Sequence, residues 1–172
     1  MYNREAAVFY AHKWAFSRNP RYYNFENIGG DCTNFASQVI YAGCGEMNYT
    51  PTFGWYYNSL NDRSPSWTGV NQLYNFLINN QGRGPRAVLS TFSEVEPGDI
   101  IQLDFNAQTP EFDHSPVVVD KGFGTPDTIL VAAHTNDSDY RPLSTYNYEN
   151  FRVLKIFCDW IKTALISHNK FR

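Results

Sequence analysis

The order of hydrophobic patterns along the chain constrains its fold more than any other feature. Before Gly82, three segments show apolar residues at the three- and four-residue spacing of helices. After Gly82 and Pro85, apolar residues alternate or run together as they do in strands. Because the helices come first and the strands last, the expected fold class is α+β. We therefore expect N-terminal helices packed on one side of a mainly antiparallel β-sheet.

The predicted helices cover residues 4–17, residues 32–42 and a stretch that follows Trp67. Asp31 is expected to cap the second helix and Gly43 to end it. Strands are predicted over residues 87–89, 99–105, 114–120, 128–134 and 153–160, with a hairpin turn in residues 122–127. Residues 45–66 are rich in Pro, Gly, Asn and aromatic residues, and we expect a long loop there.

The bulk properties indicate one domain and exclude some functions. A chain of 172 residues can bury one substantial core, and we expect a domain over residues 1–160 with residues 161–172 as a tail or terminal helix. A net charge of −3 and a pI near 5.7 disfavour nucleic-acid binding. No apolar run approaches the roughly 20 residues that cross a bilayer, and the N-terminal residues show no secretory signal.

Cys32 follows the Gly29-Gly30 turn and opens the second predicted helix. A thiol there faces unpaired backbone N–H groups and the positive end of the helix dipole, and both favour the reactive thiolate. The charge of Asp31 opposes the thiolate, and the sequence does not decide which effect is larger. With three cysteines, at least one thiol is unpaired or pairs between chains. Cys44 and Cys158 are interpreted as small buried hydrophobic residues.

A thiol nucleophile needs an imidazole that accepts its proton and returns it to the leaving group. His114 opens an otherwise apolar strand, and His134 ends the strand that is expected to pair with it. The hairpin places these two residues nearly opposite each other, and alternation places Asn136 on the face of His134. We therefore expect a triad of Cys32, His114 and either His134 or Asn136, in which the third group holds the tautomer of His114.

Several motifs resemble those of known hydrolases. Asp31-Cys32-Thr33 before a helix, Pro97-Gly98-Asp99 before a strand, and His114 before a valine-rich strand resemble papain-like cell-wall hydrolases of the NlpC and CHAP kinds. The chain is similar more closely to the "Putative amidase domain" family of bacterial proteins, over about residues 2–158. The matching stretches are residues 6–11, 18–20, 31–38, 42–43, 66–67, 98–99, 114–115, 134–137 and 141–143.

The resemblance implies a papain-like fold and a cysteine-dependent amidohydrolase or peptidase without a cofactor or metal. It implies that Cys32 is the nucleophile, His114 the base and His134 the third catalytic residue, with Asn136 and Asp137 as alternatives for that third role. Cys32 would attack an amide carbonyl, and water would release the acyl group from a thioester. The implied substrate is peptidoglycan or a peptide. The implied location is extracellular or in the cell wall, if the chain is a mature or cloned domain.

Two further parts of such a site are expected. The oxyanion hole would combine the backbone N–H of Cys32 with one donor from residues 22–27. Trp55 and Trp67 are expected either to wall the cleft and contact substrate, because aromatic residues usually line such sites, or to be core residues that anchor the loop.

Three other interpretations stay open at this stage. The protein could be an inactive module that binds cell wall or carbohydrate, with Cys32 buried and with stacking platforms at Trp55, Tyr56, Tyr57 and Trp67. A zinc site made of Cys32, His114 and His134 is disfavoured, because paired local spacings such as C-x2-C are absent. A carboxylate hydrolase could use nearby acidic residues, although no spacing demands it: Asp99, Asp104, Asp113 and Asp137. The sequence does not determine the oligomeric state.

Overall fold

The computed structural model describes residues 1–158 and shows the expected α+β fold. Its helices are α1 (Arg4–Trp14), α2 (Cys32–Cys44), α3 (Pro65–Thr68) and α4 (Val70–Asn79), and η1 (Phe92–Glu94) and η2 (Leu143–Thr145) are single 3-10 turns. The predicted tail, residues 161–172, and the end of the last predicted strand lie outside the described residues. Within residues 1–158, no helix has the length and apolar character needed to span a membrane.

The main sheet has six strands: β3 (Arg86–Ser90), β4 (Ile100–Asp104), β5 (Val117–Asp120), β6 (Leu130–Ala133), β7 (Ser138–Pro142) and β8 (Asn150–Phe157). Their order is β3-β8-β4-β5-β6-β7, and every neighbouring pair is antiparallel. The pairing of Val117 with Ala132 confirms the predicted hairpin between β5 and β6. The edge strand β7 was not predicted, because its sequence, Ser-Asp-Tyr-Arg-Pro, lacks a regular apolar alternation.

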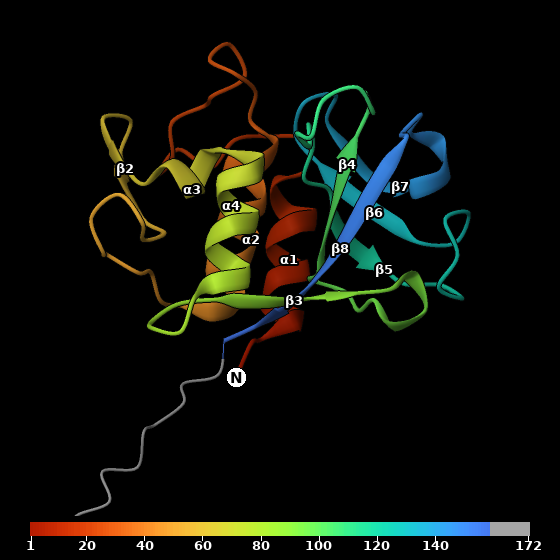
Figure 1. The fold of residues 1–172 in the computed structure, drawn as a ribbon, viewed down its shortest axis with the longest axis horizontal. Helices are drawn as coiled ribbons and strands as arrows, with labels where there is room; N and C mark the ends of the chain where they lie inside the picture. The colour runs from red at the N-terminus through yellow and green to blue at the C-terminus, as the bar shows by residue number, and fades with distance from the viewer. Residues whose placement is uncertain (159–172) are drawn as a thin grey trace, which may run out of the picture.

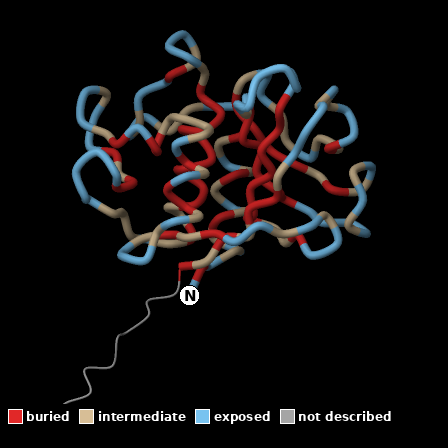
Figure 2. The backbone as a smooth tube through the Cα atoms, in the orientation of Figure 1, coloured by how far each residue is buried: buried red, intermediate tan, exposed pale blue. Residues whose placement is uncertain are grey.

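The sheet has a core on each face. α1 and α2 pack together and contact β5 and β6, which places them on one face of the sheet (Figure 1). The larger core lies on this side and includes Phe35, Val39 and Ile100. A smaller core on the opposite face includes Leu103 and is completed by residues of the connections between strands. Figure 2 shows the buried residues concentrated in the central helices and strands.

α2 is the helix that positions Cys32, and it is buried from Cys32 to Ile40. It ends at Gly45 rather than at Gly43, where the sequence predicted its end. Gly45 has a φ of 72°, in the left-handed region that glycine favours, and its N–H donates to the carbonyl of Tyr41. Gly43 stays helical, and the Tyr2 ring packs so closely on it that a Cβ atom would overlap the ring.

The segment predicted as a long loop, residues 45–66, contains a small hairpin of β1 (Tyr57–Ser59) and β2 (Asp62–Arg63). Trp55 and Trp67 were expected either to wall the cleft or to anchor the loop in the core, and both side chains are 0% exposed. Their rings pack 4.7 Å apart, and their indole N–H groups donate to Ser37 and Asn34 of α2. Both tryptophans are therefore core residues that hold the loop on α2, and they offer no surface to a substrate.

A disulfide joins Cys44, at the end of α2, to Cys158, which follows β8. Cys158 is buried, as its interpretation as a small buried hydrophobic residue implies, but the disulfide with Cys44 was not predicted. The sequence separation of 114 residues hid the pairing, because only the antiparallel packing of β8 brings the two Cα atoms to 5.5 Å. With this pair formed, Cys32 is the free thiol of the chain.

Candidate active site

Cys32 is the first residue of α2, and its side chain is almost fully enclosed, with 7% of the residue exposed. Its sulfur lies 3.7 Å from the hydroxyl of Thr33. The backbone N–H groups of Ser115 and Thr33 are also near enough to the sulfur to lower the pKa of the thiol, against the larger rise from burial. The start of α2 thus meets the segment that leads into β5, and the thiol lies at this junction.

The environment of Cys32 favours the neutral thiol. Burial raises its pKa, and the negative charge of Asp31 adds to this rise. The hydrogen bonds from Thr33 and Ser115 act in the opposite direction but are smaller. The thiolate that the helix terminus was expected to favour is therefore disfavoured in this enclosed state, because desolvation outweighs the local donors.

His114 lies just before β5, and its backbone pairs with Leu103, with N···O distances of 3.0 Å and 3.2 Å. Its ring packs against the rings of Tyr146 and Phe105, with centroid distances of 5.5 Å and 6.2 Å. Only 5% of the residue is exposed. Burial and the positive charge of Arg141 lower its pKa to about 4. His114 is therefore a neutral imidazole at pH 7 and can accept a proton.

Ser115 links the neighbourhoods of Cys32 and His114, although the thiol and the imidazole make no hydrogen bond with each other in residues 1–158. Ser115, whose N–H lies near the Cys32 sulfur, directly follows His114 in the chain. Tyr146 packs on the ring of His114, and its hydroxyl is close enough to Cys32 for the thiolate charge to raise its pKa. A thiol, a neutral imidazole and a phenol therefore share one enclosed site.

Tyr146 is a site residue that the sequence analysis missed. Its hydroxyl is buried and makes no hydrogen bond of full geometry within the described residues, although the side chains of Ser138 and Arg141 lie close enough to lower its pKa against the larger rise from burial. The Arg141 guanidinium lies over its ring, 3.6 Å from the centroid, and is held there by the side chain and carbonyl of Thr145. No sequence signal marked this residue, since it is one of 12 tyrosines and follows η2, in a connection between strands. A buried phenol that lacks a full hydrogen bond and lies beside a thiol is able to donate one to a substrate atom.

A buried polar network anchors the start of α2 to the sheet. The Ser115 hydroxyl lies 3.1 Å from the Thr33 hydroxyl and accepts a hydrogen bond from the Gln102 amide at 3.1 Å. The same amide donates to the carbonyl of Val70, and the Gln102 oxygen accepts from Arg152 at 2.8 Å. These contacts fix the position of the thiol relative to β4 and β5.

Asp31 does not cap α2 through its side chain, as the sequence predicted. Its fully buried carboxylate instead accepts hydrogen bonds from the Phe25 N–H, the Asn34 amide and Nδ1 of His134. Burial opposes ionisation, but these hydrogen bonds, that of His134 foremost, hold the pKa of Asp31 below its usual range. Asp31 is therefore a charged anchor that faces His134 rather than a simple helix cap.

The contacts of His134 point away from His114. Its Nδ1 bonds to Asp31, and its Nε2 lies 2.7 Å from the carbonyl of Trp14. Because a carboxylate and a carbonyl only accept, both ring nitrogens donate. The ring also stacks on Phe35, with a centroid distance of 4.1 Å. The orienting role expected for His134 therefore finds no supporting contact, since both nitrogens are occupied elsewhere.

The two alternatives for the third catalytic residue lie in the turn after β6. Asn136 has a positive φ of 57°, and Asp137 accepts two hydrogen bonds of 2.9 Å from Arg18. Neither side chain has a contact with His114 among the described residues. Neither ring nitrogen of His114 thus has a hydrogen-bond partner in residues 1–158.

Four of the backbone N–H groups in residues 22–27, where an oxyanion donor was expected, are engaged in other hydrogen bonds. The backbone N–H groups of Tyr23 and Phe25 donate to Tyr57 and Asp31. Those of Tyr22 and Glu26 donate to Asn19 and Asn24. This segment uses these donors to hold its own shape.

The other acidic residues have structural contacts. Asp99 is fully buried and accepts hydrogen bonds from Arg4 and from the N–H of Ile156. Asp104 and Asp113 accept from backbone and amide groups of neighbouring loops. Within residues 1–158, no cluster of three or more His, Cys, Asp or Glu side chains is arranged to hold a metal ion. These contacts lend no support to a carboxylate hydrolase or to zinc.

Comparison with known proteins gives a family. A family model described as "Putative amidase domain" matches residues 1–157. The chain is 38% identical over 143 residues to YhbB of Bacillus subtilis (strain 168). The aligned region covers 81% of this chain and 43% of YhbB. It is 28% identical over 105 residues to YjcM of the same organism. This second aligned region covers 61% of this chain and 23% of YjcM.

Both relatives are described as uncharacterized proteins, and the chain spans less than half the length of either. No solved structure matches the chain. The family match covers nearly all of the described fold, including the enclosed site around Cys32 and His114. The chain therefore belongs to the "Putative amidase domain" family, whose name indicates the hydrolysis of amide bonds.

Proposed function

We propose that this protein is a papain-like thiol amidase or peptidase that uses Cys32 as its nucleophile and His114 as its base. The observation that carries the proposal is the enclosed junction of α2 and β5. There a free thiol at a helix start lies beside the N–H of Ser115, the residue that follows the neutral imidazole of His114. A nucleophile and base held in this way are the parts that acyl transfer requires.

The proposed reaction has two steps. First, His114 accepts the thiol proton as the Cys32 sulfur attacks the amide carbonyl, and it then gives that proton to the leaving amine. The carbon–nitrogen bond breaks, and the acyl group remains on the sulfur as a thioester. Second, His114 accepts a proton from water, the hydroxyl attacks the thioester, and the acid leaves as the thiol regains its proton. A neutral thiol and a neutral imidazole in the resting state suit this sequence.

The developing oxyanion needs two donors. The backbone N–H of Cys32 lies at the start of α2, where the helix dipole is positive. We infer that the Tyr146 hydroxyl is the second donor, since it is buried, lacks a hydrogen bond of full geometry among the described residues and is close to the thiol. Arg141 over the phenol ring favours this donation electrostatically.

The ring of His114 has packing partners rather than a third catalytic residue among the described residues. Phe105 and Tyr146 contact it, and the backbone pairing with Leu103 fixes its position. We therefore infer that the reaction uses a dyad of Cys32 and His114. Substrate reaches the dyad after these covering aromatic side chains move, since both residues are nearly inaccessible.

The proposed substrate is peptidoglycan, at a cross-peptide or sugar–peptide amide, in the cell wall of a bacterium. This is supported by the resemblance of the Cys32 and His114 motifs to cell-wall hydrolases of the NlpC and CHAP kinds. It is also supported by the Cys44–Cys158 disulfide, since disulfides persist in oxidising compartments outside the cytosol. The competing proposal of an inactive wall-binding module relied partly on Trp55 and Trp67 as stacking platforms, and both are buried.

The test is hydrolysis of purified cell walls, with the released fragments identified by mass spectrometry. We expect Cys32→Ala to lower the rate by about 10³-fold or more, because the nucleophile is lost. Cys44→Ser with Cys158→Ser is the matched control, since it alters two cysteines without touching the dyad. If folded Cys32→Ala still clears walls at the wild-type rate, the nucleophile is another group.

A further inference from the structure

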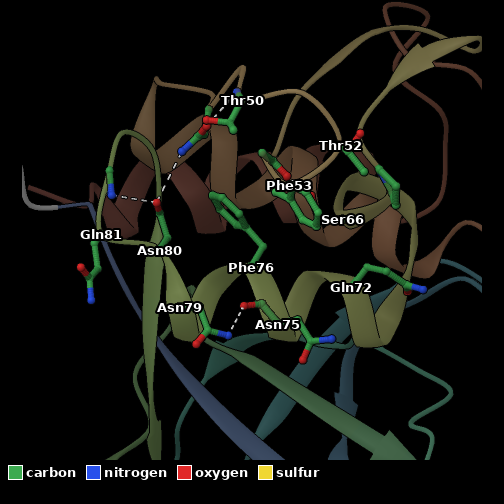
Figure 3. Close-up of a pocket in the computed structure, with 14 residues that line it drawn as sticks. Thr50, Thr52, Phe53, Ser66, Gln72, Asn75, Phe76, Asn79, Asn80 and Gln81 are labelled. Carbon is green, nitrogen blue, oxygen red and sulfur yellow. Dashed lines mark hydrogen bonds between the residues drawn. The ribbon is translucent and has the colours of Figure 1, made fainter.

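A cavity outside the candidate active site lies between α4 and the segment of residues 48–54 (Figure 3). Its volume is about 700 Å³. This lies within the roughly 300–1,000 Å³ that small-molecule sites occupy. Its lining includes neither Cys32, His114 nor Tyr146. The cavity is therefore a separate feature that the proposed chemistry does not use.

The lining of this cavity carries no charged side chain and is rich in amides and hydroxyls. A charged ligand would lose its hydration there without gaining an opposite charge. Amide and hydroxyl side chains both donate and accept hydrogen bonds, so they match a ligand that carries hydroxyl or acetamido groups. The lining also includes Phe53, Phe76 and Pro65, and much of its accessible surface is apolar, so it favours an uncharged ligand that has both apolar faces and hydrogen-bonding groups.

Three amide side chains on one face of α4 keep hydrogen-bonding capacity for such a ligand. The amides of Gln72 and Asn75 make no hydrogen bond to another described residue, and both residues are exposed. Asn79 donates to the backbone carbonyl of Asn75, which leaves its side-chain oxygen unpaired. By contrast, Asn80 donates to the carbonyls of Arg83 and Pro85 and serves the local structure.

Two aromatic rings add apolar surface to these amides. Phe76 points from α4 toward the opposite segment and is 8% exposed (Figure 3). Phe53, on the segment across from α4, is 83% exposed, which is unusual for so large an apolar side chain. A pyranose ring has apolar faces and a rim of hydroxyl groups, and aromatic faces beside free amides complement both.

The segment that faces α4 is held in place without a ligand. Asn48 and Trp55 exchange backbone hydrogen bonds of 2.9 Å and 2.7 Å, and the Ser66 hydroxyl donates to the carbonyl of Gly54 at 2.6 Å. Gly54 has no room for a Cβ atom, because the carbonyl of Asn48 lies against it. Such a preformed wall lowers the cost of ordering on binding.

We propose that this cavity binds an uncharged oligosaccharide built of N-acetylated hexosamines. The acetamido group offers one donor and one acceptor, which the amides of Gln72 and Asn75 match. The link to a wall polymer rests on the proposed function, because such sugars would belong to the polymer whose amides Cys32 cuts. Binding itself is independent of any hydrolysis.

The test is an NMR titration of the full chain with chitotriose, the trimer of N-acetylglucosamine. We expect shift changes confined to residues 48–54 and 65–82. The double variant Gln72→Ala with Asn75→Ala should weaken binding by about tenfold, the loss of two ordinary hydrogen bonds. Phe53→Ala should weaken it by a similar factor.

Two matched controls should bind like the wild type: Gln108→Ala, an exposed amide, and Phe123→Ala, a ring that is 91% exposed, both outside the cavity. Three results would overturn the proposal: no shift at millimolar chitotriose, shifts confined to the site of Cys32 and His114, or equally tight binding of the deacetylated, positively charged trimer. The titration does not depend on hydrolysis, so its failure is distinguishable from failure of the Cys32→Ala wall assay.

Discussion

Two buried histidines of this protein stand at neighbouring strand ends and have opposite surroundings. His114 precedes β5, and its ring contacts two aromatic side chains with no hydrogen-bond partner in residues 1–158. His134 follows β6, and its two nitrogens bond to Asp31 and to the carbonyl of Trp14. The chain thus uses one residue type at paired positions in two different ways.

The comparison separates the histidine that we propose as the base from one whose ring nitrogens both have fixed partners. An imidazole without fixed partners, with a pKa lowered to about 4, can accept a proton from a thiol. An imidazole that donates from both nitrogens holds parts of the chain together, here the end of α1, the turn before α2 and the end of β6. Hydrogen-bond capacity, rather than position in a strand, distinguishes the two roles.

The largest expected effect comes from replacing the proposed base. His114→Gln should lower wall hydrolysis by about 10²- to 10⁴-fold, because the proton acceptor is lost. The thermal midpoint should change little, since no hydrogen bond of the ring is removed. His12→Gln is the control, because His12 pairs with Asp139 at the surface. If His114→Gln hydrolyses walls at the wild-type rate, His114 is not the base.

The next effect is on stability and concerns His134. His134→Ala removes the main hydrogen-bond donor of the buried Asp31 carboxylate, which keeps the Arg18 guanidinium at 3.4 Å, so we expect a loss of about 2–3 kcal/mol in the free energy of unfolding. His12→Ala breaks a more exposed His–Asp pair and should cost at most about 1 kcal/mol. Urea unfolding of both variants measures the difference. Equal losses would show that the buried pair of His134 and Asp31 stabilises the fold no more than the pair of His12 and Asp139.

The pH dependence of stability offers a third comparison. The pKa of His114 falls from 6.5 when unfolded to about 4 when folded, so the unfolded chain binds the extra proton between these values. Stability from this residue is therefore present above pH 6.5 and is lost as pH falls toward 4. The loss is roughly 3 kcal/mol. Chemical denaturation at several pH values should show a shallower slope in His114→Gln than in the wild type.

The smallest expected effect concerns the phenol beside the proposed base. Tyr146→Phe removes a hydroxyl that makes no hydrogen bond of full geometry in residues 1–158, so stability should be kept while kcat falls by about 10- to 100-fold. KM should change less, because the donor acts mainly on the transition state. Tyr148→Phe, in the same apolar cluster, is the control. An unchanged kcat in Tyr146→Phe would exclude it as an oxyanion donor.

Much of the fold was predictable from local patterns. The helix that begins at Cys32 and the hairpin of β5 and β6 follow from apolar periodicity and turn residues. The edge strand β7 was not predictable, because a polar edge strand lacks that periodicity. The role of Trp55 and Trp67 could not be decided from the sequence, because aromatic residues in a loop suit either a cleft or a core, and only burial distinguishes these.

Cys32 and His114, the proposed nucleophile and base, could be singled out from the sequence, whereas the residues around them could not. Cys32 and His114 carry local signals, a helix start and a strand start. Tyr146 carries none, because its proposed role depends on being buried without a full hydrogen bond in residues 1–158. The disulfide was hidden for a similar reason, since Cys44 and Cys158 are 114 residues apart.

The sequence by itself determined the order of helices and strands, the helix start at Cys32 and the pairing that places residues 114 and 134 at neighbouring strand ends. These features depend on residues close together in the chain, so periodicity and turn chemistry encode them. Only the tertiary structure decided which histidine has ring nitrogens with fixed partners and whether the thiol is charged. Both outcomes depend on desolvation and on partners such as Asp31 and His134, which are 103 residues apart in the chain and meet only in the folded core.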